Sequence, residues 1–308
     1  MRIEGKNYYV ESDEKVRFKG VIAKNKCLNI FGKDADNLSG KKISVLNKIG
    51  KSVEIVEIAY DFAYRMTYGE EGEHNRVRVG GEKIREIDEV FCNTFQGKLG
   101  ELALAYEIKN KKYIVSSVDT KVFKRGIWDK FDLKVRKGIN NVGTIISVKS
   151  IKYYSELLLL EKDAYTNDGV YKFSEIDSDL YCLVKISPVC QSIIENYFEE
   201  LGKKQQEAKV DKDDSEELEK KQQEVVIVDK DDLKKRILKQ NWSYQIVGFI
   251  TKEMFKKCIE DRNIIKKNDF LNGSVKMDAT NYYYLGKNMI PFSKIGDYLN
   301  NDLIKIKK

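Results

Sequence analysis

Hydrophobic and polar residues alternate in two segments near the middle of the chain. Residues 128–135 read Trp-Asp-Lys-Phe-Asp-Leu-Lys-Val, and residues 144–150 read Thr-Ile-Ile-Ser-Val-Lys-Ser. Alternation with a period of two residues is typical of a β-strand that buries one face. The turn-forming stretch Lys-Gly-Ile-Asn-Asn lies between the two segments at 137–141. The pattern therefore predicts a β-hairpin.

This hairpin would bring an acid and an amine together. The alternation places Asp132 on the polar face of the first strand, and Ser147 and Lys149 on one face of the second. Such an arrangement suits hydrolysis of a phosphodiester, because a carboxylate holds a divalent cation while a lysine steadies the attacking water or the developing charge.

The patterns elsewhere predict a mixed α/β (α+β) fold. Residues 1–58 are predicted to be β-rich and residues 59–110 mainly helical, with a glycine-rich interruption. Further strands are predicted at 112–116, 156–161, 181–186 and 244–250, and helices at 189–202, at 252–260 with Thr251 as the cap, and near 293–299. The N-terminal 58 residues are either a small DNA-contacting subdomain or an extension of the main sheet.

A charged segment interrupts the predicted main domain of residues 59–308. Residues 203–236 contain an imperfect duplication, in which Lys-Lys-Gln-Gln-Glu and Val-Asp-Lys-Asp-Asp each occur twice. Two copies are too few for a solenoid, and the low hydrophobicity favours a solvated helical arm or a mobile insertion. The many acids of this segment would repel DNA.

The predicted helix at 97–108 carries an acid in an apolar surround. Leucine, alanine, tyrosine and isoleucine occupy nearly all of its faces, so the helix should be buried. A buried carboxylate at Glu101 needs a partner. The partner is either a metal or water, which would be functional, or a lysine in a structural ion pair.

Glu101, Asp132 and Lys149 resemble the active-site residues of the PD-(D/E)XK nuclease superfamily, and of its restriction endonucleases in particular. They match the helix glutamate, the strand aspartate and the lysine of the (D/E)-X-K tripeptide by type, order and rough spacing, over roughly residues 92–165. Two positions depart from the pattern, because Phe131 stands in place of proline and Ser147 in place of the second acid. Some members with Ser-Val-Lys take this carboxylate from a later position. Glu161 is the first candidate here, with Glu156 and Asp163 behind it.

The resemblance implies a restriction-endonuclease-like mixed sheet flanked by helices and a type II enzyme that cuts double-stranded DNA at a specific site. It also implies Mg²⁺ as the cofactor, with Mn²⁺ as a substitute, held by Asp132, Glu101 and Glu161 while Lys149 acts on the water. A homodimer is expected, because a two-fold symmetric target is cut in both strands.

The composition is compatible with this expectation and excludes other classes. The net charge of +7 suits a polyanionic partner, although lysine-rich usage of this kind also follows from an AT-biased genome. A single histidine and five widely spaced cysteines disfavour a zinc site and a catalytic triad. The absence of a P-loop motif disfavours a nucleotide cofactor. Neither a signal peptide nor a membrane-spanning run is recognisable, so we expect a cytoplasmic protein with no membrane association.

Candidate DNA-binding residues flank the predicted hairpin on its N-terminal side. Arg76 and Arg78 could address base edges, whereas Lys121, Lys124 and Arg125 could contact phosphates. Three alternatives stay open: a structure-selective repair nuclease or junction resolvase, a catalytically inactive DNA-binding module, and an interaction protein whose working part is the 203–236 arm.

Overall fold

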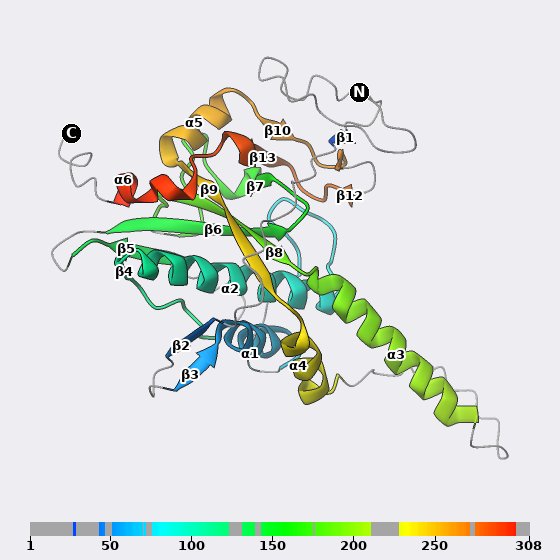
Figure 1. Ribbon diagram of the computed structural model, residues 1–308. Helices are drawn as coiled ribbons and strands as arrows, with labels where there is room; N and C mark the ends of the chain where they lie inside the picture. The colour runs from blue at the N-terminus through cyan, green and yellow to red at the C-terminus, as the bar shows by residue number, and fades with distance from the viewer. Residues whose placement is uncertain are drawn as a thin grey trace.

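The fold is given by a computed structural model. It describes residues 27–28, 43–46, 51–69, 71, 76–122, 131–138, 143–174, 176–210, 228–271 and 275–299, with the backbone alone at 27–28, 46 and 204–210. A mixed sheet lies at the centre, with helices and a second, smaller sheet packed on it (Figure 1).

The central sheet has five strands in the order β4-β5-β6-β8-β9. Their bounds are β4 (Ile114–Val115), β5 (Leu133–Arg136), β6 (Thr144–Lys152), β8 (Leu180–Ser187) and β9 (Ser243–Thr251). The pairs β4–β5, β5–β6 and β8–β9 are antiparallel, whereas β6 and β8 are parallel. The predicted hairpin is therefore confirmed as β5–β6, and the predicted mixed sheet as the core of the fold.

Helix α2 (Ile87–Asn110) covers one face of this sheet, and α1 (Ile55–Thr67) packs on the far side of α2 (Figure 1). Because α2 lies between two layers, it is apolar on nearly all sides, and the prediction that its 97–108 portion is buried is confirmed. Tyr60 of α1 and Phe91 of α2 meet edge to face with ring centroids 5.9 Å apart. The main hydrophobic core lies between these helices and the sheet.

A second layer covers part of the opposite face. Strands β10 (Ile264–Ile265), β13 (Asn281–Leu285) and β7 (Leu157–Glu161) form an antiparallel sheet in that order, beside helix α5 (Lys252–Glu260). Thr251 caps α5 as predicted, because its Oγ1 accepts a hydrogen bond from the Met254 backbone N–H at 3.2 Å. A separate cluster of leucine, tyrosine and phenylalanine side chains fills the space between this layer and the central sheet.

The N-terminal segment is placed in two parts. Strands β2 (Ser44–Leu46) and β3 (Ser52–Glu54) form an antiparallel hairpin, and Ile43 and Val45 pack against the main core. Strand β1 (Cys27–Leu28) pairs in parallel with β11 (Phe270–Leu271), which also pairs with β12 (Val275–Lys276). The rest of the segment predicted to be β-rich, at 1–26, 29–42 and 47–50, lies outside the described residues.

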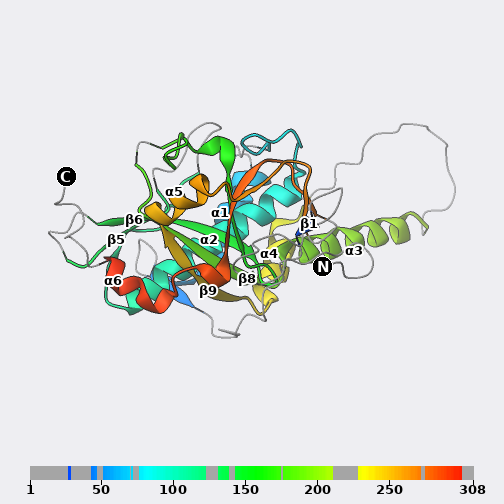
Figure 2. The same ribbon diagram turned by 90° about the horizontal axis from the view of Figure 1, so that it is seen from above.

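Helices occupy both described ends of the charged segment at 203–236, and only its C-terminal end departs from the expected solvated arm. Helix α3 (Cys190–Val210) continues into it and projects from the body of the molecule (Figures 1 and 2). Helix α4 (Lys230–Lys239) begins before the segment ends, and its Leu233 is fully buried in the main core. Leu233 and Ile237 are four residues apart, so they share one helix face and bury together. Residues 211–227 lie outside the described part.

The C-terminal end contains the short helix α6 (Ile295–Leu299), as expected. Among the described residues, no helix has the length and apolar character needed to span a membrane.

Candidate active site

The first candidate residue, Asp132, lies where strand β5 begins. Leu133 pairs with Ile146, so Asp132, the residue immediately before β5, lies opposite Ser147. The Asp132 carboxylate oxygen Oδ2 accepts hydrogen bonds from the Ser147 Oγ at 3.2 Å and the Val148 backbone N–H at 2.6 Å. The structure therefore brings together Asp132 and the second predicted strand, at the serine that stands in place of the family's second acid.

Lys149 points away from α2. Ile146 and Val148 are buried in the core beneath that helix, whereas Ile151 packs against the cluster on the opposite face. Because side chains alternate along a strand, Lys149 shares that opposite face with Ser147 and hence with Asp132. The predicted acid and amine thus occupy one face of the hairpin.

A cleft of about 890 Å³ opens beside the C-terminal half of β6. Beyond Ile146, no strand of the described residues pairs with β6 on its β5 side. The cleft is lined there by residues 148–152, on one side by the N-terminal half of α2, and on the other by residues of β7 and by Tyr165 and Tyr171. Lys149 and Glu161 both line it.

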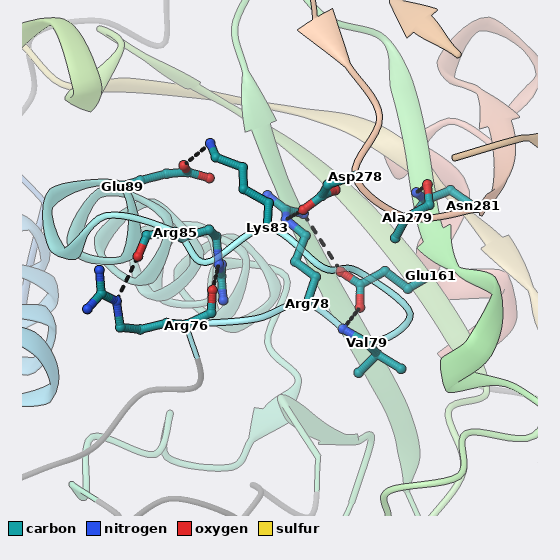
Figure 3. A network of polar contacts seen from close by, with 10 residues as sticks. All are labelled: Arg76, Arg78, Val79, Lys83, Arg85, Glu89, Glu161, Asp278, Ala279 and Asn281. Atoms are coloured by element: carbon teal, nitrogen blue, oxygen red, sulfur yellow. Dashed lines mark hydrogen bonds and ion pairs between the residues drawn. The ribbon is translucent and has the colours of Figure 1, made fainter. Parts of the chain in front are cut away.

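Glu161 ends β7, and its side chain is 26% exposed. Its Oε2 accepts a hydrogen bond from the Val79 backbone N–H at 3.2 Å, and its Oε1 lies 3.7 Å from the Arg78 guanidinium (Figure 3). Burial raises the pKa of the Glu161 carboxyl above its ordinary value, and the positive charges of Arg78 and Lys149 oppose that rise. Arg78 and Lys149 therefore act on the same carboxylate.

Tyr171 links the two candidate carboxylates. It lines the cleft, and its ring packs against Tyr165 at a centroid distance of 5.3 Å. Burial raises the pKa of its hydroxyl to about 12, and the negative charges of Glu161 and Asp132 add to that rise. Both acids thus lie near one phenol, although Asp132 precedes β5 and Glu161 ends β7. The sequence offered no signal for Tyr171, because its segment carries no recognisable motif.

The other two candidates for the missing carboxylate do not line the cleft. Glu156 contacts the buried Lys185 ammonium of β8 at 3.3 Å. Asp163 lies against the loop at Gly80, where an added Cβ would come within 2.2 Å of its Oδ2. Gly80 has a φ of +71°, which favours glycine. Of the three predicted acids, Glu161 alone lines the cleft.

Glu101 lies elsewhere. Its Oε2 accepts a hydrogen bond from the Lys98 Nζ at 2.7 Å, and the same ammonium donates to the Asp119 carbonyl at 2.7 Å. Lys98 is 3% exposed and Glu101 is 14% exposed, and neither lines the cleft. The structural ion pair, which the sequence left open as an alternative, is thus present. The structure does not bring Glu101 into the cleft beside Lys149 and Glu161.

The predicted DNA-binding residues have three different settings. Arg76 and Arg85 close a loop by donating from each Nε to the other's carbonyl, at 2.7 and 3.2 Å (Figure 3). Arg78 extends between Glu161 and Asp278, whose Oδ2 lies 3.3 Å from its Nε. Lys121 is exposed. Lys124 and Arg125 lie outside the described residues. Arg85, which sequence reasoning missed, is 8% exposed, and burial lowers its pKa.

Comparison with known proteins returns no matching family model, no significantly similar curated protein and no significantly similar solved structure. The function of this protein must therefore be inferred from the site itself.

The acids that could hold a cation are few. In the part of the chain that the structure describes, no three histidine, cysteine or acidic side chains converge on one point. Asp132 does not line the cleft, whereas Glu161 does, and the negative charges of both act on Tyr171, which also lines it. One or two carboxylates, completed by water and substrate phosphates, are the donors with which proteins usually hold Mg²⁺. Glu161 at the cleft and Asp132 beside Ser147 are carboxylates of this kind.

Proposed function

We propose that the protein is a Mg²⁺-dependent endonuclease that cuts double-stranded DNA at a specific site, as a type II restriction enzyme of the PD-(D/E)XK kind does. One observation carries the proposal: the Asp132–Ser147 contact at the start of β5 puts an acid on the same face of the hairpin as Lys149, which lines the cleft with Glu161. Ser147, which stands in place of the family's second acid, would donate the hydrogen bond that orients Asp132.

The side chains divide the work as follows. Lys149 contributes a positive charge at the scissile phosphate and orients the attacking water. Asp132 and Glu161 are the oxygen donors, with Asp132 held in place by the Ser147 hydroxyl and the Val148 N–H. A bound Mg²⁺ would neutralise phosphate charge and lower the pKa of its water. Glu101 acts on this site indirectly. It forms an ion pair with the buried Lys98 on α2, and the Lys98 ammonium also donates to the Asp119 carbonyl.

Cutting both strands of a duplex requires two such sites. We therefore propose that the working form is a homodimer with two-fold symmetry. We place it in the cytoplasm, where its DNA substrate would be met.

The test is digestion of unmethylated phage DNA by the full chain with Mg²⁺, with Mn²⁺ in a parallel reaction and EDTA as the control. Discrete fragments that are absent in EDTA support a site-specific enzyme. Cleavage of branched DNA in preference to plain duplex would instead favour a repair nuclease or junction resolvase. No cleavage of any of these DNAs by folded protein would contradict the nuclease proposal.

A catalytically inactive DNA-binding module is the second candidate, and one observation favours it. Oδ2 of Asp132 already accepts two hydrogen bonds from its own hairpin, so this carboxylate has a structural role in the absence of any cation. Duplex binding by the wild-type chain without cleavage in either metal would select this alternative.

A further inference from the structure

Arg78 lies between two carboxylates that belong to different segments of the chain. Its Nη1 is 3.7 Å from the Glu161 Oε1, and its Nε is 3.3 Å from the Asp278 Oδ2 (Figure 3). Glu161 ends β7, whereas Asp278 lies between β12 and β13, so one guanidinium joins two separate segments. The structure thus offers a role for Arg78 other than the base contact expected from the sequence.

The loop that carries Arg78 is closed by hydrogen bonds at both its base and its tip. At the base, the Arg85 backbone N–H donates to the Arg76 carbonyl at 3.0 Å, in addition to the two Nε–carbonyl contacts. At the tip, the Gly81 N–H donates to the Arg78 carbonyl at 3.0 Å. A Cβ added to Gly81 would lie 3.6 Å from the Asp278 carbonyl oxygen, so the tip lies against the Asp278 segment. The backbone therefore presents Arg78 to the carboxylates in a defined position.

The same loop holds the second oxygen of the Glu161 carboxylate. The Val79 backbone N–H donates to Oε2 at 3.2 Å, so each carboxylate oxygen has one partner from the loop. The two oxygens of an ionised carboxylate offer about four lone-pair sites, and Glu161 lines the cleft. The loop therefore fixes the orientation of this carboxylate and leaves lone pairs for a further ligand.

We propose that Arg78 is a positioning residue, whose guanidinium, with the Val79 N–H, fixes the Glu161 carboxylate in the orientation that binds the cation. Asp278 acts one step further away, because it orients the guanidinium. Partners that hold a ligating carboxylate in place commonly raise metal affinity, since a carboxylate that is already oriented loses less freedom on binding. This inference rests on the proposed function, which requires the cation.

The experiment measures metal binding separately from cleavage. The probe is Mn²⁺ alone, added to the full chain without DNA, and the free ion is counted by electron paramagnetic resonance. Arg78→Met removes the guanidinium and keeps an apolar stem, and it should raise the Kd for Mn²⁺ about tenfold or more. Arg78→Lys keeps a positive charge near Glu161 and should recover part of that affinity. Asp278→Asn should weaken binding by a smaller factor than Arg78→Met does.

Cleavage of plasmid DNA gives the second readout. In Arg78→Met, the Mg²⁺ concentration that gives half-maximal cleavage should rise, and added Mg²⁺ should restore most of the lost rate. A residue that only stabilises the fold would not shift the metal requirement in this way. Lys267→Ala is the matched control, because its ammonium contacts Glu82 of the same loop at 2.6 Å and neither residue lines the cleft. Its Kd for Mn²⁺ should equal that of wild type.

Three results would overturn the inference. The first is a wild-type Kd for Mn²⁺ in folded Arg78→Met, and an altered preference among DNA sequences in that variant would return Arg78 to base recognition. The second is a further loss of Mn²⁺ affinity when Arg78→Met is added to Glu161→Gln, because Arg78 would then act on another ligand. The third is absence of Mn²⁺ binding by the wild-type chain. Failure of a Mn²⁺-binding wild-type chain to cut any duplex would instead overturn the proposed function alone.

Discussion

Two lysine–glutamate combinations of this protein have opposite environments. Lys98 and Glu101 form a tight pair on α2, with 2.7 Å between nitrogen and oxygen and almost no exposure. Lys149 and Glu161 come from different strands, line an open cleft and influence each other electrostatically. In the first pair, the ammonium and the carboxylate neutralise each other inside the fold. The second leaves charge facing a space that a ligand can enter, which is what a catalytic site needs.

The largest effect on cleavage is expected from changes to Lys149 and to Asp132. Lys149→Ala and Asp132→Ala should each lower the cleavage rate by about 10²–10⁴-fold, the usual contribution of a positioned catalytic group. Rates are measured on plasmid DNA with saturating Mg²⁺. Lys162→Ala is the control, because Lys162 is an exposed lysine next to Glu161 that does not line the cleft. Wild-type rates in Lys149→Ala would remove this residue from the mechanism.

Changes to the buried Lys98–Glu101 pair should affect stability instead of cleavage. Glu101→Gln leaves the buried Lys98 ammonium without its carboxylate, so the free energy of unfolding should fall by about 3 kcal/mol. The double variant Lys98→Met/Glu101→Leu should recover most of that loss, because it removes both buried charges. Denaturant unfolding measures both.

Cleavage by the double variant decides the role of Glu101. If this residue only holds α2, the folded double variant should cut DNA at the wild-type rate. A stable but inactive double variant would return Glu101 to the active site, where the family resemblance expects it.

The raised pKa of Glu161 should make the stability of the protein depend on pH. Its folded pKa is raised by burial, so the folded state binds the proton more tightly than the unfolded state. Without metal, this carboxyl therefore contributes stability that is present below its unfolded pKa and is lost as the pH rises through its folded pKa. Glu161→Gln should abolish that loss and unfold at a higher temperature than wild type at neutral pH.

Glu161→Gln should also lower the cleavage rate, by about tenfold or more if the carboxylate helps to hold the cation. Melting curves from pH 4 to pH 8 in EDTA, compared with cleavage rates in Mg²⁺, measure both effects. Full activity in Glu161→Gln would show that the missing carboxylate lies at another position.

The smallest effects on stability are expected at two glycines of α2. An added Cβ at Gly100 would meet a neighbouring side chain, whereas one at Gly97 would meet nothing. Gly100→Ala would place a Cβ 2.0 Å from Ser150 Oγ and should cost about 1–3 kcal/mol through overpacking. Gly97→Ala meets nothing within 4 Å, and because alanine is the better helix former it should stabilise the protein by up to about 1 kcal/mol. Equal unfolding free energies for the two variants would contradict the close approach at Gly100.

Much of the architecture was predictable from local patterns. The alternation around Ser147 predicted β6, the Thr251 signal predicted the start of α5, and the all-round apolar character of 97–108 predicted a buried helix. Other features were not predictable in this way. The high charge of residues 203–236 concealed the buried Leu233, because scattered apolar residues in a polar stretch carry little weight until a partner surface exists.

The sequence by itself determined which residues alternate, which helix is buried, and that an acid and a lysine share one face of a hairpin, because these follow from the periods of strands and helices. Only the tertiary structure decided that Lys98 and Glu101 are buried away from the cleft and that Glu161, rather than Glu156 or Asp163, lines it. Those outcomes depend on contacts between residues far apart in the chain, and no local pattern encodes which distant side chain fills a given space.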